Sequence, residues 1–282
     1  MLGVVRALIE ALDLTVYSYV KPGAPHRFST RFKDLHTYVK AITSALETYY
    51  EASEEGVSVA KGRAGFTDIR VGALIKKAGI SSSRYLETVE LPEYHILLIP
   101  AVIAASYSIE YKGYMDVNLY QKAFESLTTY SRGRDAVDVL DYIRSYGGLL
   151  RKVSGSASIT PGLVTTEGWS IKDLMDELGR SHRVASVALG RYISPVELSS
   201  KFIKNYVQGE DANTSAIKVY SYLLEATTNV KEDLSIKGKE DFMRVLRLDN
   251  ELGRKGVNLS PLLPVMNESI FIAYLSLEFP KK

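Results

Sequence analysis

Apolar side chains recur at intervals of three and four residues along most of the chain. This spacing places side chains on one face of a helix, whereas the strict alternation of apolar and polar residues that is typical of strands is scarce. The pattern predicts an all-α protein with about ten to thirteen helices of ordinary length. The clearest series comprises Leu35, Tyr38, Val39, Ile42, Ala45, Leu46 and Tyr49, and further series lie in residues 171–185, 217–224 and 242–252.

Several helix starts can be placed by their capping residues. Asp116 precedes a segment that reaches Tyr130, Ser170 precedes another amphipathic segment, and Ser194 is followed directly by Pro195. A short polar side chain at the cap and a proline at the first helical position are typical of helix N-termini. We therefore expect one helix to begin after each of these caps.

The longest polar interruption of the chain runs from Gly147 to Gly168. Its composition is not that of a linker, and the amphipathic segments on both sides of it need burial. We therefore expect residues 1–282 to form a single compact multi-helix domain. The most apolar run, residues 96–105, contains Pro100 and is shorter than the roughly 20 residues that a membrane span needs, so it predicts a buried core helix.

The composition is that of a soluble globular protein, with 46% hydrophobic and 24% charged residues. The 35 lysines and arginines nearly balance the 33 acidic residues, so the net charge indicates neither nucleic acid nor a membrane as a partner. The absence of cysteine excludes disulfides and thiolate chemistry and favours a cytoplasmic location. The scarcity of glutamine hints at a thermophile. The 19 tyrosines, whose rings suit interfaces, leave a homo-oligomer open.

The segment from Lys21 to Arg27, which reads KPGAPHR, concentrates features of a phosphate-binding loop. Two prolines stiffen it, and Gly23 permits another group to approach the backbone closely. Lys21, His26 and Arg27, together with Arg31, could direct hydrogen-bond donors at phosphate oxygens. The segment therefore predicts a phosphate or nucleotide site, and the alternative is a rigid connector between two helices.

Three aspartates, at positions 135, 138 and 141, follow one another at intervals of three residues within one predicted helix. Carboxylates paired on one helix face could hold Mg²⁺ together with waters and substrate phosphates. Asp135 and Asp138 are therefore candidate metal ligands. The alternative for Asp135 is a structural role at the start of the helix, where a carboxylate meets the positive end of the helix dipole.

Neither the histidines nor known catalytic motifs provide further candidate site residues. His95 borders the apolar run and His182 lies on the apolar face of the 171–185 series, so both are expected to be hydrogen-bonded core residues. The chain contains no glycine-rich loop of the P-loop or dinucleotide-binding type, no GxSxG sequence and no HExxH sequence. Those nucleotide-binding, hydrolase and metalloprotease classes are therefore excluded as far as they depend on these motifs.

Four segments of the chain, in their order, resemble the triphosphoribosyl-dephospho-CoA synthase family, particularly its archaeal branch. The resemblance extends over most of the chain. Its segments are Lys21-Pro22-Gly23 followed by His26-Arg27, Phe32 and Asp34; VGALIKKAG at 71–79; HILLIPAVIAA at 95–105; and DAVDVLDYIRSYGGL at 135–149.

The resemblance implies an all-α fold and a transferase activity. Members of this family join ATP to dephospho-CoA through a ribosyl bond and release adenine. Such a reaction needs cations and Mg²⁺ around the triphosphate and stabilisation of positive charge on the sugar. On this reading ATP and a dephospho-CoA-like acceptor are the ligands, Lys21, His26 and Arg27 bind phosphate, and Asp135 with its neighbouring carboxylate binds the metal.

The chain also departs from the polar motifs of the family. Ala73 replaces a glutamate, Leu91 lies where the family has an Asn-Thr turn, and Ser181-His182 replaces an Arg-Asp pair. Leu263-Pro264-Val265 and Ser269 replace a terminal Asn-Pro-Gly and aspartate. Alanine and leucine neither bind a metal nor transfer a proton. The alternative function is therefore a non-catalytic relative that binds nucleotides or a protein partner, in which triphosphoribosyl transfer is weak or absent.

Overall fold

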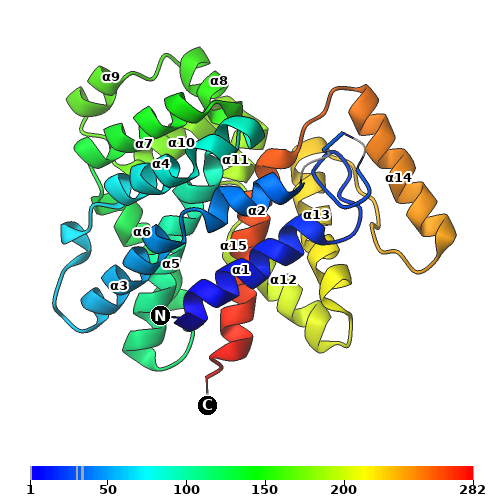
Figure 1. Ribbon diagram of the computed structural model, residues 1–282, viewed down its shortest axis with the longest axis horizontal. Helices are drawn as coiled ribbons and strands as arrows, with labels where there is room; N and C mark the ends of the chain where they lie inside the picture. The colour runs from blue at the N-terminus through cyan, green and yellow to red at the C-terminus, as the bar shows by residue number, and fades with distance from the viewer. Residues whose placement is uncertain (1, 30, 33–34, 282) are drawn as a thin grey trace.

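The computed structural model describes residues 2–29, 31–32 and 35–281, and this part of the chain contains 15 α-helices and no strand (Figure 1). The predicted all-α class is thus confirmed. Asp34 of the family resemblance lies outside the described residues. The first eight helices are α1 (Leu2–Tyr17), α2 (Leu35–Thr43), α3 (Leu46–Ala60), α4 (Val71–Val89), α5 (Glu93–Lys112), α6 (Val117–Tyr130), α7 (Arg134–Tyr146) and α8 (Gly148–Ser156). The others are α9 (Pro161–Thr166), α10 (Ile171–Ser181), α11 (Arg183–Ala188), α12 (Pro195–Val207), α13 (Ala212–Thr228), α14 (Lys239–Arg254) and α15 (Leu263–Glu278), with short 3₁₀ helices η1 (Phe66–Asp68) and η2 (Ser260–Leu262).

Two apolar helices, α5 and α15, form the centre of the molecule. In Figure 1, α15 runs through the middle of the view with α1 crossing it. Helix α15 packs against α1, α12, α13 and α5, and α5 packs against α3, α6 and α4. Every residue from Glu93 to Ser106 is buried, which confirms the core helix predicted around Pro100. Burial of this length on all sides explains why neither helix has a polar face.

A single hydrophobic core joins the two halves of the chain. It contains Leu12 and Ile99 from before the polar interruption, Leu150 and Val164 from within it, and Ile270 from after it. The chain is therefore one compact multi-helix domain, as the sequence predicts. Within the described residues, no helix combines the length and the apolar character that crossing a membrane requires.

The three predicted helix caps are confirmed. The Asp116 carboxylate accepts hydrogen bonds from the N–H groups of Asn118 and Leu119 at 3.0 Å, and α6 ends at Tyr130. Ser170 forms a capping box with Asp173 at the start of α10. Ser194 accepts from the N–H of Val196, and α12 begins at Pro195. These starts were predictable because each cap satisfies backbone donors within three residues of itself.

The sequence wrongly predicted where helices continue or stop in three segments. The 35–49 series is split between α2 and α3 by a turn at Ser44 and Ala45, although its apolar period is unbroken. Residues 147–168, predicted as a polar interruption, contain α8 and α9. The 171–185 series is broken at His182, whose extended backbone separates α10 from α11.

The same break corrects the expected position of His182. Its side chain is exposed and not in the core, and its Nδ1 accepts the N–H of Ala185 as the N-cap of α11. His95, in contrast, is buried as predicted, with Nδ1 at 2.7 Å from the Tyr49 hydroxyl and Nε2 at 3.0 Å from the Ser82 hydroxyl. Burial lowers the pKa of His95 to about 3, so it is a neutral core residue.

Helix α14 lies at the edge of the molecule, apart from the central helices (Figure 1). Only Val245, Asp249 and Leu252 of its side chains are buried. Asp249 and Leu252 contact Gly23 in the loop that follows α1, and Phe242 packs edge-to-face on Phe28 of the same loop with ring centroids 5.0 Å apart. We call residues 18–29 the Gly23 loop, and it is the segment that holds α14 to the body.

Candidate functional site

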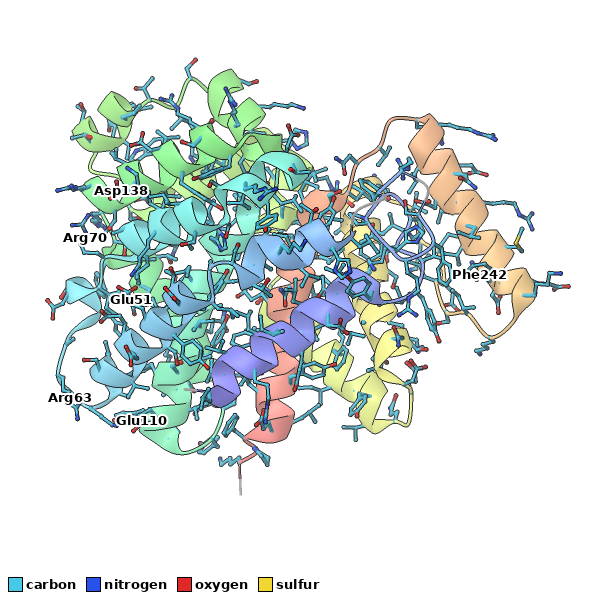
Figure 2. All side chains as sticks on the ribbon, viewed as in Figure 1. Glu51, Arg63, Arg70, Glu110, Asp138 and Phe242 are labelled. Carbon is cyan, nitrogen blue, oxygen red and sulfur yellow. The ribbon has the colours of Figure 1, made fainter. Side chains whose placement is uncertain are left out.

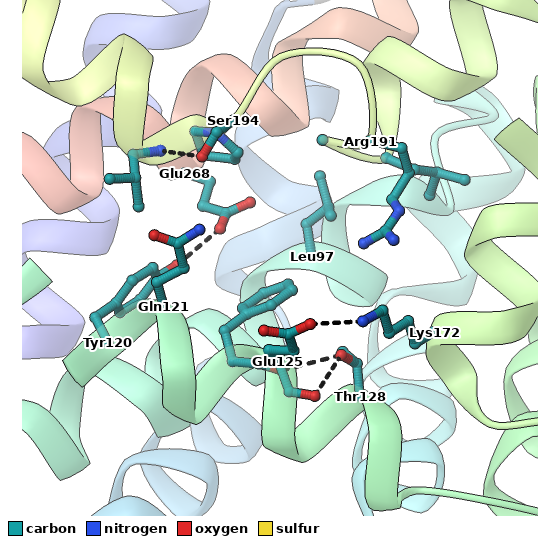
Figure 3. A pocket seen from close by; sticks show the side chains of 14 residues that line it. Leu97, Tyr120, Gln121, Glu125, Thr128, Lys172, Arg191, Ser194 and Glu268 are labelled. Carbon is teal, nitrogen blue, oxygen red and sulfur yellow. Dashed lines mark hydrogen bonds and ion pairs between the residues drawn. The ribbon is translucent and has the colours of Figure 1, made fainter. Parts of the chain in front are cut away.

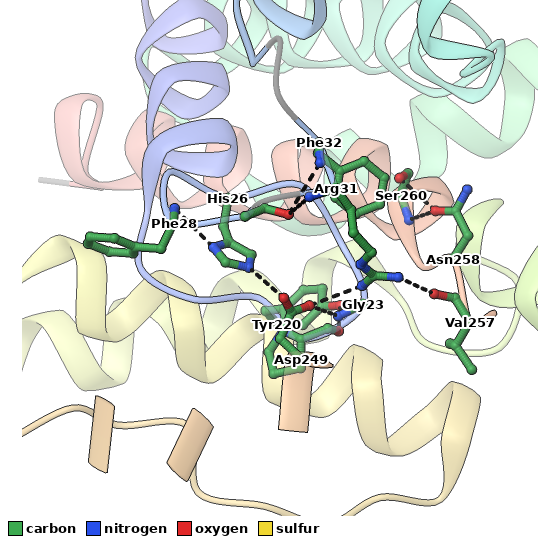
Figure 4. Close-up of polar contacts among 12 residues, drawn as sticks. Gly23, His26, Phe28, Arg31, Phe32, Tyr220, Asp249, Val257, Asn258 and Ser260 are labelled. Atoms are coloured by element: carbon green, nitrogen blue, oxygen red, sulfur yellow. Dashed lines mark hydrogen bonds and ion pairs between the residues drawn. The ribbon is translucent and has the colours of Figure 1, made fainter. Parts of the chain in front are cut away.

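Two of the side chains predicted to bind phosphate, His26 and Arg31, lie with the Gly23 N–H around a carboxylate of the protein itself (Figure 4). The N–H of Gly23 donates to Asp249 Oδ1 at 2.8 Å, and the Arg31 guanidinium donates to the same oxygen at 3.1 Å. His26 Nε2 lies 3.4 Å from the other oxygen, Oδ2. Gly23 adopts a φ of +82°, a conformation that favours glycine. The loop thus holds an anion, and that anion is Asp249 of α14.

The protonation states fit this arrangement. Burial tends to raise the pKa of Asp249, but the His26 contact, the Gly23 N–H and the Arg31 charge outweigh it, so the pKa is lowered and the group is ionised at neutral pH. Burial lowers the pKa of His26 despite its contact with Asp249. Because His26 Nδ1 accepts the N–H of Phe28, its single proton lies on Nε2 and faces Asp249.

Lys21 and Arg27 are engaged with the C-terminal end of α1. Lys21 is fully buried, and its Nζ donates to the carbonyls of Val16 and Ser18 at 3.3 Å and to the Ser18 hydroxyl at 3.1 Å. Burial places its pKa well below the usual value. Arg27 is exposed, and its Nε donates to the Tyr17 carbonyl at 2.6 Å. Both side chains therefore satisfy carbonyls that the end of a helix leaves unpaired.

Asp135 and Asp138 are paired with cations. Arg70 Nε lies 3.0 Å from Asp135 Oδ1, and Lys76 Nζ lies 3.0 Å from Asp138 Oδ1. Among the described residues there is no group of three or more histidines and carboxylates that could hold a metal ion. Asp135 also lies in the first turn of α7, in agreement with its structural alternative.

The acidic pair and the Gly23 loop do not meet. Figure 2 shows Asp138 and Arg70 at one side of the molecule and Phe242 of α14 at the other. Because Phe242 contacts Phe28 of the Gly23 loop, the two predicted halves of the nucleotide site lie on different sides of the fold.

A third region brings together segments that the sequence did not join. A cavity of about 260 Å³ opens beside α8, and a shallower one that shares Glu90, Gly148 and Lys152 continues along that helix. We call the two together the α8 groove. The residues that line it include Glu90, Leu91, Gly148, Leu149, Arg151, Lys152, His182, Val184, Asn258, Ser260 and Pro261.

One wall of the groove forms where the backbone at Gly148 packs closely against the backbone at Glu90. Gly148 has a φ of +72°, and a Cβ on it would lie 2.2 Å from the carbonyl oxygen of Glu90, so only glycine fits. On the opposite wall, Asn258 Oδ1 accepts from both the N–H and the hydroxyl of Ser260, at 3.0 and 2.7 Å. The N–H of the intervening Leu259 donates to the Gly23 carbonyl at 2.8 Å. The groove therefore adjoins the Gly23 loop.

The groove carries free positive charge. Arg151 and Lys152 are exposed on α8, and neither has an ion-pair partner within the described part of the chain. His182 uses Nδ1 for its cap, so its second ring nitrogen is available at the rim. The sequence analysis missed Arg151 and Lys152. Two adjacent cations one turn after a Gly-Gly pair were the available signal, because glycines let a helix start approach another segment.

Comparison with known proteins gives no match to a family model, to a curated protein or to a solved structure. The family resemblance therefore depends on the quoted segments themselves. One cavity is lined by Gly148 and Leu149 of the Gly-Gly-Leu segment and by Leu91 and His182, two positions at which the chain departs from that family. The chemistry of the groove, with free cations beside a close-packed glycine, suits an anionic ligand.

Proposed function

We propose that this protein binds a phosphorylated small molecule of the nucleotide class, such as ATP, in the α8 groove. The observation that supports the proposal is the pair of unpartnered cations, Arg151 and Lys152, on the wall of a groove that includes the Gly-Gly-Leu segment of the family resemblance. Ammonium and guanidinium groups that are not neutralised by the protein are available to phosphate oxygens.

The charge of the groove is consistent with such a ligand. Glu90 is the acidic residue in its lining, against Arg151 and Lys152. His182 at the rim adds a ring nitrogen that can form a hydrogen bond with a ligand. The Gly23 loop, in contrast, already holds the Asp249 carboxylate, so phosphate would have to displace α14 to bind there.

Triphosphoribosyl transfer to a dephospho-CoA-like acceptor is a second candidate, based on the resemblance. It requires Mg²⁺, for which the predicted ligands are Asp135 and Asp138. Both are paired with Arg70 and Lys76, and Asp135 lies about 18 Å along α7 from Gly147, at about 1.5 Å per helical residue. Catalysis requires groups that act on the transition state at the bound ligand. The arrangement therefore favours the binding alternative over transfer.

Calorimetry with ATP tests the proposal, with adenosine as the phosphate-free comparison. We expect ATP to bind and adenosine to bind at least about tenfold more weakly, since phosphate contacts supply most of the affinity. The double variant Arg151→Ala plus Lys152→Ala should lose about tenfold or more in ATP affinity. The charge-matched control, Arg63→Ala plus Lys112→Ala, changes two exposed cations elsewhere and should leave it unchanged. Equal ATP affinity in parent and groove variant would refute the proposal.

Adenine release distinguishes binding from transfer. ATP, dephospho-CoA and Mg²⁺ are incubated with the protein, and adenine is measured against a protein-free control. Binding without adenine release supports the non-catalytic alternative. Release that Asp135→Asn abolishes would instead support transfer and give Asp135 its predicted metal role.

A further inference from the structure

A second, separate cavity lies among α6, α10, α12 and α15 (Figure 3). Its volume is about 170 Å³, and we call it the α6–α12 cavity. Leu97, Phe124 and Val196 line it together with several polar and charged side chains. A concave space onto which polar groups converge is a candidate small-molecule site. None of its lining residues belongs to the α8 groove.

Glu268 of α15 is the buried polar group of this cavity. Its side chain is 2% exposed, and its Oε1 accepts the Tyr120 hydroxyl at 2.7 Å. Its Oε2 has no hydrogen-bond partner among the described residues. A buried polar oxygen without a partner costs free energy unless a ligand or water pairs with it. The cavity is the space from which such a partner can reach Glu268.

Glu268 is a hydrogen-bond donor at neutral pH. Burial raises its pKa to about 8, although the Tyr120 hydrogen bond acts in the other direction. Because Tyr120 already donates to Oε1, the carboxyl proton belongs on Oε2, the free oxygen. A neutral carboxylic acid in an apolar site donates to a carbonyl or hydroxyl oxygen of a ligand.

Two cations lie across the cavity from Glu268. Figure 3 shows Lys172 and Arg191 on the side opposite to Glu268 and Gln121, with Leu97 between them. Lys172 Nζ is 2.6 Å from Glu125 Oε1, and Arg191 pairs with Asp176. A guanidinium has five N–H groups and an ammonium has three, so each cation retains donors for a ligand. Glu125 and Asp176 therefore neutralise the two cations, and Glu268 adds a neutral acid.

We propose that the α6–α12 cavity binds a short-chain oxo- or hydroxycarboxylic acid, with its carboxylate at Arg191 and Lys172 and its second oxygen accepting a hydrogen bond from Glu268. The N–H groups that Arg191 and Lys172 keep beyond their ion pairs, together with the Glu268 hydroxyl, favour a ligand with acceptor oxygens over an amine. The small volume, about 170 Å³, favours a ligand of a few carbon atoms over a nucleotide. The site is independent of the nucleotide proposed for the α8 groove.

Calorimetry with pyruvate, lactate and 2-oxobutyrate tests this site. We expect at least one of them to bind about tenfold or more tightly than acetate, which lacks the second oxygen, and ethanolamine not to bind. Arg191→Ala should weaken that binding about tenfold or more. Arg180→Ala is the matched control, because Arg180 is exposed at the end of α10 and forms its ion pair with Glu177 outside the cavity.

Two variants of Glu268 test the hydrogen bond. Glu268→Gln keeps an N–H donor of the same shape and should bind within about threefold of the parent, whereas Glu268→Leu should lose about tenfold or more. Circular dichroism establishes that each variant is folded, and Arg191→Ala tests the site even where Glu268→Leu does not fold.

Absence of binding by all three acids, stronger binding of ethanolamine, or unchanged binding by Arg191→Ala would overturn the proposal. ATP affinity should be the same in parent and Arg191→Ala, so a failure here is distinguishable from a failure at the α8 groove.

Discussion

Asp249 and Glu268 are both buried acids from the C-terminal part of the chain, and their surroundings differ in one respect. Asp249 accepts from Gly23 and Arg31 and also contacts His26, and its pKa is lowered. Glu268 has a single donor, Tyr120, and its pKa is raised to about 8. One region surrounds a charged acid with donors, and the other leaves a neutral acid half-satisfied beside a cavity.

The number of donors around each acid distinguishes a structural contact, at Asp249, from a potential ligand-binding group, at Glu268. Donors that converge on an internal carboxylate fix two segments to each other and leave little capacity for a ligand. An acid whose second oxygen is buried without a partner can still accept or donate one hydrogen bond. The Gly23 loop was the stronger candidate by composition, but the cavity at Glu268 is the better candidate by geometry. Both conclusions can be tested by changing the acids and their donors.

Asp249→Ala should give the largest effect on stability. The change leaves the Gly23 N–H, the His26 Nε2–H and the Arg31 guanidinium without their shared acceptor. We expect a loss of about 4 kcal/mol in the free energy of unfolding, because breaking a buried pair leaves its partners desolvated and unpaired. Urea unfolding of parent and variant measures it. A loss below about 1 kcal/mol would show that the contact does not hold the structure together.

The pH dependence of stability should have opposite signs for the two acids. The folded-state pKa of Asp249 is lowered, so its contribution is present above the unfolded pKa of about 3.9 and is lost as pH falls through the folded pKa. The folded-state pKa of Glu268 is raised to about 8, so the unfolded chain releases the proton first. Stability should therefore fall as pH rises from about 4.5 to 8.

Glu268→Gln isolates this second slope. Relative to the parent, the variant should gain about 3 kcal/mol in unfolding free energy between pH 5 and pH 8, because glutamine does not titrate. Glu93, a second buried acid with a pKa of about 8, is unchanged in both proteins and cancels in the comparison. Parallel stability curves of parent and variant would show that Glu268 is ionised in the folded protein.

Removing the hydroxyl of a buried tyrosine in each region compares the free energies that the two hydrogen bonds contribute. Tyr120→Phe removes the one hydrogen bond of Glu268 and should cost about 2 kcal/mol. Tyr220→Phe removes a 2.7 Å hydrogen bond to the Pro22 carbonyl in the Gly23 loop and should cost about 1 kcal/mol. Chemical denaturation at pH 7 measures both. The reverse order would contradict the view that Glu268 is the less satisfied acceptor.

Asp138→Asn should have the smallest effect, below about 1 kcal/mol. Its partners Arg70 and Lys76 are nearly half exposed, and surface ion pairs contribute little. Thermal unfolding at low and high salt provides the measurement. A loss of unfolding free energy as large as that of Asp249→Ala would contradict this prediction. It would show that the ion pairs of Asp138 stabilise the fold despite their exposure.

The sequence predicted the parts of the fold that depend on neighbouring residues. Asp116, Ser170 and Ser194 satisfy backbone donors within three positions, so their helices could be placed from the sequence. The turn at Ser44 and the break at His182 lie within unbroken apolar periods and carry no glycine or proline. Those breaks depend on how the helices pack, which local propensity does not determine.

The candidate site depended on contacts across the whole chain. The donors in and after the Gly23 loop were predicted to bind a phosphate, but His26 and Arg31 face Asp249, which lies more than 200 residues away in a helix that its apolar spacing predicted without marking this carboxylate. Glu268 follows Asn267 in an otherwise apolar helix, and its importance depends on Tyr120 and a cavity between four helices. A sequence alone shows neither burial nor an unpaired oxygen.

The position of α14 at the edge of the molecule determines which part of the protein unfolds first. This helix buries three side chains and is tied to the body through the Gly23 loop, whereas α5 and α15 are buried along nearly their whole length. Segments with few buried contacts open locally at a small fraction of the global free energy. Amide protons of α14 should therefore exchange with solvent long before those of α5. Protonation of Asp249 in acid would detach this helix first, and the core would remain folded beneath it.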